Sequence, residues 1–238
     1  MTRTRRPFVA VRAAAVLATA GLVLSGCTGG GSPGVAVTVG EESLSVLEVD
    51  RAAESMCASI TAGVGDPAAA QTVIPLSFVR QGTLQLLTLD AQARQIAEEY
   101  DVEPGPDYAR ELASSKQRAS SLPPDAREDY AKVMSANALA VSLLERVGRV
   151  ELERSGTTDP TTEEAGAAGV EVFRSWPEEH GIDVDPRYGL EVVDGQLAAA
   201  DTHTSVAVSE VARNGLVGDV GQLDPAYLES LPSSQRCG

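Results

Sequence analysis

The chain has 238 residues, a formal net charge of −15 at pH 7 and a sequence pI near 4.5. Such an acidic surface repels the phosphates of nucleic acid and of anionic lipid, so the composition excludes both as primary partners.

The first element expected is an export signal at residues 1–26. Its positive start, which holds four arginines, precedes a short apolar run, Ala13–Leu24. This run is too short to span a bilayer, as expected of a signal peptide. Leu24-Ser25-Gly26-Cys27 places small residues directly before a cysteine, the pattern of a lipobox, so lipidation with an acyl chain such as palmitate is expected at Cys27. The alternative is an ordinary secretory signal with a chance cysteine, and the twin-arginine and general export routes both stay open.

A glycine-rich tether and a strongly acidic remainder follow the signal. Residues 27–34 should be flexible. No acidic residue and four of the 19 basic residues precede Cys27, so the remainder carries 34 acids against 15 bases, a formal charge of −19. The membrane anchor must then be covalent rather than electrostatic. We expect the protein to be lipid-anchored at the extracytoplasmic face of the cell membrane.

Two cysteines remain after lipidation of the first. In an oxidising compartment Cys57 and Cys237 form an even pair, and we expect a disulfide between them. The alternatives are two free thiols or a redox role, but neither cysteine stands in a Cys-x-x-Cys arrangement.

The elements expected after the tether begin with a strand and two helices. Val35–Val39 is a β-branched run that ends at a glycine and predicts a strand with a turn. Ser45-Val46-Leu47-Glu48 has the form of a capping box and opens a helix. Asp66-Pro67 is expected to start the next helix, which Pro75 should kink or interrupt and which then continues to Tyr100.

The second half of the chain is expected to be helical with a little strand. The predicted elements are a polar helix over 107–120, a long helix over about 125–154, a helix over 161–179, a strand over 188–193 and a short final helix capped by Asp224-Pro225.

The pattern from Val35 to Arg154 resembles the N-terminal chaperone module of the SurA-like foldases. The resemblance is carried by Val35–Glu41 with Leu44-Ser45, by Glu48-Val49-Asp50, and by Leu84–Ala93 with Asp101-Val102. Asp183–Gly189 resembles a segment of actinobacterial lipoproteins of this kind and implies a strand that returns to the N-terminal one. The scarcity of lysine, with many alanines and glycines, also suggests the GC-rich genome of an actinobacterium.

The resemblance implies a mainly α fold. The helical module would span 35–155, and a small β element would form from the N-terminal strand and the returning C-terminal strand. Residues 156–238 would supply a helix, a strand and a tail that pack back on the module. Many such foldases also carry a parvulin prolyl-isomerase domain, but only about 30 residues separate the long helix from Asp183, and His180 and His203 lie outside any such pattern. The isomerase is therefore expected to be missing.

The sequence offers few residues for chemistry. Asp201, His203 and Ser205 could share one face of an extended segment, but no glycine-rich elbow accompanies them, so a polar surface segment is the better interpretation. Asp183 and Asp185 lack the further oxygen ligands of a calcium loop and predict a turn. We expect no catalytic residue, no metal and no cofactor. Trp176 is expected to be a core or rim anchor, unless it is exposed for ligand contact.

The leading hypothesis is a chaperone-like lipoprotein that binds unfolded or newly exported polypeptides without turnover. The alternative is a structural or assembly lipoprotein that docks on an envelope protein complex. An enzyme and a small-molecule transport lipoprotein are weaker alternatives. The oligomeric state is open. Apolar residues at helical spacing form stripes, for example Leu86, Leu89, Ala93 and Ile96, or Ala136, Leu139, Leu143 and Val147. The client-contacting residues are open too, because the same apolar stripes serve as core. The chaperone hypothesis requires some apolar surface to remain uncovered.

Overall fold

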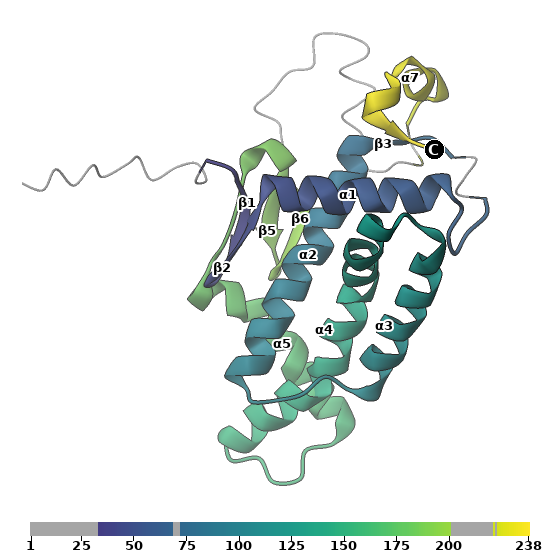
Figure 1. The fold of residues 1–238 in the computed structure, drawn as a ribbon. Coiled ribbons are helices and arrows are strands. Elements are labelled where there is room, and N and C mark those ends of the chain that lie inside the picture. The colour runs from purple at the N-terminus through teal and green to yellow at the C-terminus, as the bar shows by residue number, and fades with distance from the viewer. Residues whose placement is uncertain (1–32, 69–71, 201–220, 222) are drawn as a thin grey trace, which may run out of the picture.

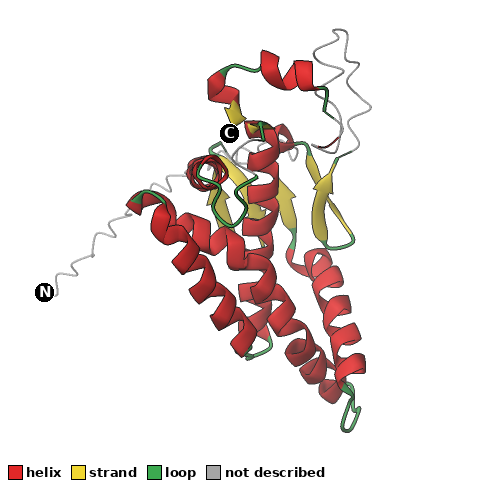
Figure 2. Ribbon diagram, turned by 90° about the vertical axis from the view of Figure 1, so that its right-hand side faces the viewer, coloured by secondary structure: helices red, strands yellow, loops and turns green. Residues whose placement is uncertain are grey.

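The computed structural model of the chain describes residues 33–68, 72–200, 221 and 223–238. The expected signal and Cys27 lie outside these residues. In the described part, helices run side by side and short strands gather at one end (Figures 1 and 2). The expected mainly α fold with a small β element is confirmed.

The N-terminal strand folds into a hairpin before the first helix. Strand β1 (Val35–Val39) pairs antiparallel with β2 (Glu42–Ser45), a strand that the sequence pattern did not indicate. Helix α1 (Val46–Thr61) begins at the predicted capping box. The Ser45 main-chain N–H donates to Glu48 Oε2 at 2.7 Å, and the Glu48 main-chain N–H donates to Ser45 Oγ at 3.2 Å.

The returning strand lies where the resemblance implied. Strand β4 (Ile182–Val184) pairs antiparallel with β1, with Thr38 opposite Asp183, and the sheet order is β2-β1-β4. This pairing brings the end of helix α5 (Thr162–His180) back to the start of the module.

The prediction of a helix starting at Asp66-Pro67 was wrong. Asp66 Oδ1 accepts a hydrogen bond from the Ala68 main-chain N–H, which makes a local turn, and residues 72–73 are not helical. Strand β3 (Ile74–Pro75) then pairs with β7 (Arg236–Cys237). Helix α2 (Leu76–Glu99) starts directly after Pro75, so this proline precedes the helix and does not kink it.

The remaining helices complete a bundle around α2. Helices α3 (Pro106–Arg118), α4 (Arg127–Arg154) and α5 agree closely with the predicted ranges. Short 3-10 turns, η2 (Ala119–Ser121) and η3 (Pro124–Ala126), link α3 to α4. Helix α1 crosses the upper ends of α2 and α4 (Figure 1).

The C-terminal region forms a hairpin and a short helix. A 3-10 turn, η4 (Pro186–Tyr188), precedes β5 (Leu190–Val193), so the predicted strand starts two residues later than expected. Strand β6 (Gln196–Ala199), which the sequence analysis did not predict, pairs with β5. Helix α7 (Pro225–Ser230) begins at its predicted cap, Asp224, and the turn η6 (Ser233–Gln235) leads to β7.

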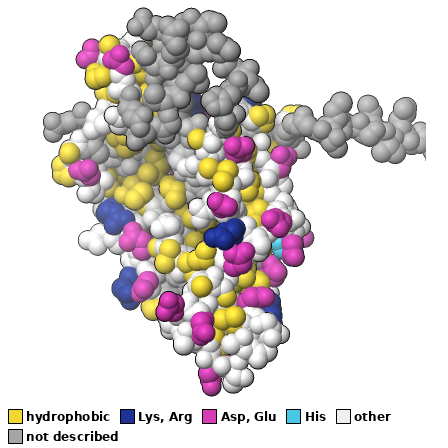
Figure 3. Space-filling view, turned by 180° about the vertical axis from the view of Figure 1, so that it is seen from behind, with side chains coloured by type: hydrophobic (Ala, Val, Ile, Leu, Met, Phe, Trp, Pro, Cys, Tyr) yellow, Lys and Arg dark blue, Asp and Glu magenta, His cyan; other side chains and the backbone are white. Residues whose placement is uncertain are grey.

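The predicted apolar stripes form the core. Leu84 and Ile96 of α2 and Leu139 and Leu143 of α4 are fully buried. Large aliphatic side chains outside the core include Leu47 of α1 and Val141 of α4, which are 75% and 58% exposed. On the face drawn in Figure 3, hydrophobic side chains form a band among scattered and predominantly acidic charges. Among the described helices, none is long and apolar enough to cross a membrane.

Candidate functional site

The two cysteines expected to pair lie together. Cys57 of α1 and Cys237 of β7 lie at disulfide distance, and their Cα atoms are 5.0 Å apart, a separation that a disulfide spans. The link would fasten the C-terminal tail to the first helix.

The candidate residues for chemistry that fall within the described ranges do not assemble a reaction site. Asp201, His203 and Ser205 lie outside the described residues. Asp185 caps the turn η4: its Oδ1 accepts from the Arg187 main-chain N–H at 2.9 Å, and the Arg187 guanidinium pairs with the same carboxyl group. These hydrogen bonds from Arg187 lower the pKa of Asp185. Asp183 lies on the exposed face of β4, and no group of three or more possible metal ligands occurs in the described ranges.

Trp176 is a core anchor, as one of the two interpretations predicted. Its side chain is only 4% exposed, its indole Nε1–H donates to Glu99 Oε2 at 3.2 Å, and its ring stacks on His180 with centroids 4.4 Å apart. Tryptophan and histidine therefore join α5 to the end of α2.

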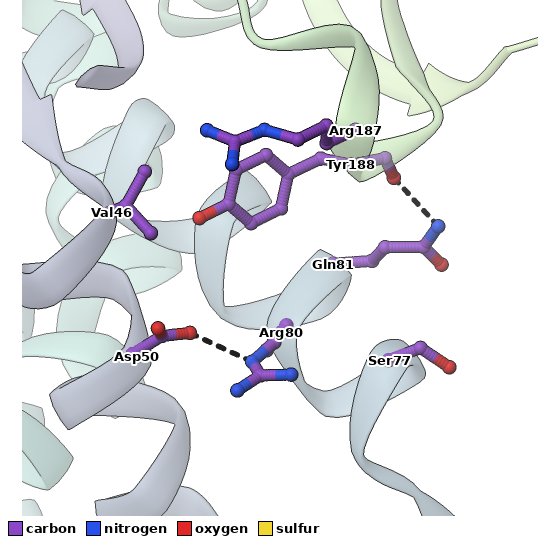
Figure 4. A pocket seen from close by; sticks show the side chains of 7 residues that line it. All are labelled: Val46, Asp50, Ser77, Arg80, Gln81, Arg187 and Tyr188. Carbon is purple, nitrogen blue, oxygen red and sulfur yellow. Dashed lines mark hydrogen bonds and ion pairs between the residues drawn. The ribbon is translucent and has the colours of Figure 1, made fainter. Parts of the chain in front are cut away.

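A polar pocket of about 300 Å³ lies where α1, α2 and η4 meet (Figure 4). Its charged and amide groups already bind one another. Arg80 Nε lies 2.7 Å from Asp50 Oδ1, and Gln81 Nε2–H donates to the Tyr188 carbonyl at 2.7 Å. Burial raises the pKa of Tyr188. The ion pair and the hydrogen bond join three elements at this pocket, and the buried Arg80 Nε makes no hydrogen bond there.

A larger cavity of about 510 Å³ lies between α2, α3 and α4, and we call it the basic groove. Its lining residues are Arg94, Tyr108, Leu112, Lys116, Arg127, Glu128, Ala131, Lys132 and Ser135. The half-buried Tyr108 and Leu112 and the buried Ala131 provide apolar surface. Concave sites with apolar walls and a few polar groups are typical of ligand-binding sites.

Four cations line the basic groove, and a buried acid holds two of them. Asp90, whose side chain is 1% exposed, accepts from Arg94 Nε at 2.8 Å and from Arg94 Nη2 at 3.0 Å. Lys132 Nζ lies 3.7 Å from the same carboxyl group. The hydrogen bonds that Arg94 donates to the Asp90 carboxylate raise the pKa of Arg94 above its ordinary range.

The other two cations have no acidic partner in the described part of the chain. Arg127 Nε–H donates to the Leu122 carbonyl at 2.9 Å, and Lys116 takes part in no hydrogen bond or ion pair there. The one acid in the lining is Glu128. The groove thus combines apolar surface with an excess of positive charge, because four bases lie beside two acids, Glu128 and Asp90.

Sequence reasoning missed the basic groove. A signal was present on α3, where Tyr108, Leu112 and Lys116 recur at intervals of four and therefore share one face. On α4, Glu128 and Lys132 repeat the same interval. Each pattern alone is typical of a solvated helix face, so only the packing of α3 against α4 defines the site. Comparison with protein-family models, with curated proteins and with solved structures finds no match to the chain.

Proposed function

We propose that the protein is a membrane-anchored, extracytoplasmic chaperone-like lipoprotein that binds unfolded or newly exported polypeptides without catalysis. The observation that carries the proposal is the basic groove, a cavity of about 510 Å³ with apolar surface between α3 and α4. The pattern of small residues before Cys27 supports the anchor, and the glycine-rich tether would leave the groove free to meet exported chains.

The burial of the predicted stripes limits where a client could bind. Most of each stripe packs inside the bundle, so a broad cradle along the module is not supported, and binding would concentrate in the groove. Burial of one large apolar side chain contributes about 1.5–3 kcal/mol. Since association itself loses translational and rotational entropy, a few such contacts give weak and reversible binding, which suits a protein that holds and releases its clients.

The side chains of the groove favour binding over turnover. Ser135 is its only hydroxyl-bearing residue of the serine or threonine type, and this hydroxyl donates to the Ala131 carbonyl at 2.8 Å. No histidine lines the groove to activate it. The groove therefore lacks the paired nucleophile and base of covalent catalysis.

A test of the proposal is suppression of aggregation of a chemically denatured model protein. The full chain, secreted with Cys27→Ser so that it carries no lipid, should reduce light scattering at several-fold molar excess. Leu112→Ser, which removes apolar surface from the groove, should weaken this effect. Val141→Ser, at an exposed position on α4 outside the groove lining, is the matched control and should retain it. An unchanged aggregation curve with the parent chain would contradict the proposal.

Crosslinking in cells separates this proposal from an assembly role. A photo-crosslinking side chain at position 116 should capture many exported proteins if the groove holds clients. Capture of only one or two envelope proteins would instead favour a structural or assembly lipoprotein.

A further inference from the structure

We infer that the basic groove selects polypeptide segments in which acidic side chains stand next to apolar ones. This inference rests on the proposed function and names its substrate class. It follows from the distribution of charge in the chain and from the arrangement of the four cations around the apolar surface.

The groove is a positive site on a strongly negative protein. After residue 27 the chain carries 34 acids and only 15 bases, yet four of these bases line one cavity, where the acids are Glu128 in the lining and Asp90 buried beneath Arg94 and Lys132. Lys116 and Lys132 are the only lysines in the sequence, and both lie there. This local excess of positive charge attracts carboxylates to a surface that elsewhere repels them.

The four cations are arranged on three helices. Arg94 of α2 donates hydrogen bonds to the buried Asp90, and Lys132 Nζ of α4 lies 3.7 Å from the same carboxyl group, so the fold orients both cations towards the groove. Lys116 of α3 and Arg127 of α4 lie on facing helices and have no acidic partner in the described residues. A carboxylate between these helices could accept charge-assisted hydrogen bonds from both, which are stronger than hydrogen bonds between neutral groups.

Apolar surface beside these cations explains why a bound segment also needs apolar side chains. Leu112 and Tyr108 lie one and two turns, respectively, before Lys116 on the same face of α3. A segment whose carboxylate reaches Lys116 therefore places its neighbouring side chains against this aromatic and aliphatic surface. An acidic segment without apolar neighbours would contact only the cations of the groove. An apolar segment without acids would contact only its apolar surface.

Charge also favours a polypeptide over an anionic membrane as the occupant. At physiological ionic strength the Debye length is about 8 Å, so a single bound segment interacts mainly with the cations around it. A lipid surface is wider and would face a whole side of the acidic protein, where repulsion dominates. Phospholipid and free acyl anions are therefore tested as competing occupants.

The test is isothermal titration calorimetry with unlabelled ten-residue peptides, since many fluorescent labels are themselves anionic and apolar. The parent peptide has two leucines, one phenylalanine and three aspartates separated by serines, and its partners replace the aspartates with asparagines or lysines. The Cys27→Ser full chain should bind the aspartate peptide about tenfold more tightly than the asparagine peptide, a difference of about 1.4 kcal/mol. Binding of the lysine peptide should be weaker still.

Charge reversal in the groove should reverse this order. The double variant Lys116→Glu with Arg127→Glu should lose about tenfold or more in affinity for the aspartate peptide and gain affinity for the lysine peptide. Arg174→Glu is the control, because Arg174 is an exposed arginine on α5 that pairs with Glu171 away from the groove. This control reverses the charge of one side chain, where the double variant reverses two. It should leave the order of the peptide affinities unchanged.

The outcomes separate this inference from the proposed function. Equal affinity for the aspartate and asparagine peptides, or an unchanged order in the double variant, would overturn the acidic preference. Saturable binding of dodecanoate or of phosphatidylglycerol vesicles, without binding of the aspartate peptide, would also overturn the acidic preference. It would indicate that the groove binds lipid. If the parent chain suppresses aggregation in either case, the proposed function stands without this selectivity; if it does not, both fail.

Discussion

Gly148 and Gly169 set the distance between α4 and α5. A Cβ atom on Gly148 would overlap the carbonyl group of Ala165, and one on Gly169 would overlap the carbonyl group of Leu144. The two helices therefore approach through backbone atoms at these points. Packed interiors tolerate such added volume poorly, because backbone cannot rotate out of the way as a side chain can.

We predict that Gly148→Ala lowers the free energy of unfolding by about 1–3 kcal/mol. Gly166→Ala on α5 is the matched control, since nothing lies within 4 Å of its added Cβ and alanine favours the helix by about 0.5–1 kcal/mol. Urea denaturation of both variants provides the measurement. If Gly148→Ala were as stable as Gly166→Ala, the close approach of α4 and α5 would be refuted.

A second residue-scale prediction concerns the cysteines. Peptide mapping without reduction should recover Cys57 and Cys237 in one linked pair. The double variant Cys57→Ser with Cys237→Ser should be less stable by about 2–4 kcal/mol, because the link restricts the unfolded chain over a separation of 180 residues. Recovery of both thiols in free form from the secreted protein would show that this disulfide does not form.

At the scale of the helix, the capping box of α1 links stability to pH. Hydrogen bonds from the Ser45 hydroxyl and main-chain N–H lower the pKa of Glu48 below its ordinary value of 4.5. A carboxyl group whose pKa is lower in the folded state stabilises the fold fully above its unfolded pKa. That stabilisation is lost as the pH falls below about 4.5 and through the folded pKa.

We therefore predict that Glu48→Gln lowers Tm at pH 7 and has little effect at pH 3. Thermal unfolding followed by circular dichroism at both pH values measures the difference. Glu54→Gln, on the same helix outside the capping box, controls for the loss of one negative charge. An equal drop in Tm at pH 7 and pH 3 would contradict a role for the ionised carboxylate.

Local signals predicted some elements well and others badly. The capping box predicted at Ser45 and the helix predicted from residue 161 were both confirmed, and at each start hydrogen bonds within four residues cap the helix. Asp66-Pro67 carries a similar start signal, but the same aspartate hydrogen bond also closes a turn, and here the turn forms. Strand β3 pairs with β7 at the far end of the chain, so no short-range pattern could reveal it. Strand β6 pairs with the preceding β5 across Asp194-Gly195, a local hairpin signal that the sequence analysis missed.

For the whole molecule, the sequence predicted the fold class better than the site. Helical stripes such as Leu139 and Leu143 indicated the core, because burial follows from periodicity. The return of β4 to β1 followed from the resemblance and not from any local pattern. The basic groove needs three helices at once, so the facing positions of Lys116 and Arg127 appear only in the folded chain.

The central claim is that the basic groove holds an unfolded polypeptide, and hydrogen–deuterium exchange with mass spectrometry tests it most directly. The Cys27→Ser chain would be measured alone and with excess of a permanently unfolded acidic polypeptide, such as reduced and carboxymethylated lactalbumin. The account predicts slower exchange in α3 and in the first turns of α4, with α5 unchanged. Equal exchange in α3 with and without the polypeptide, or protection confined to another face, would contradict it.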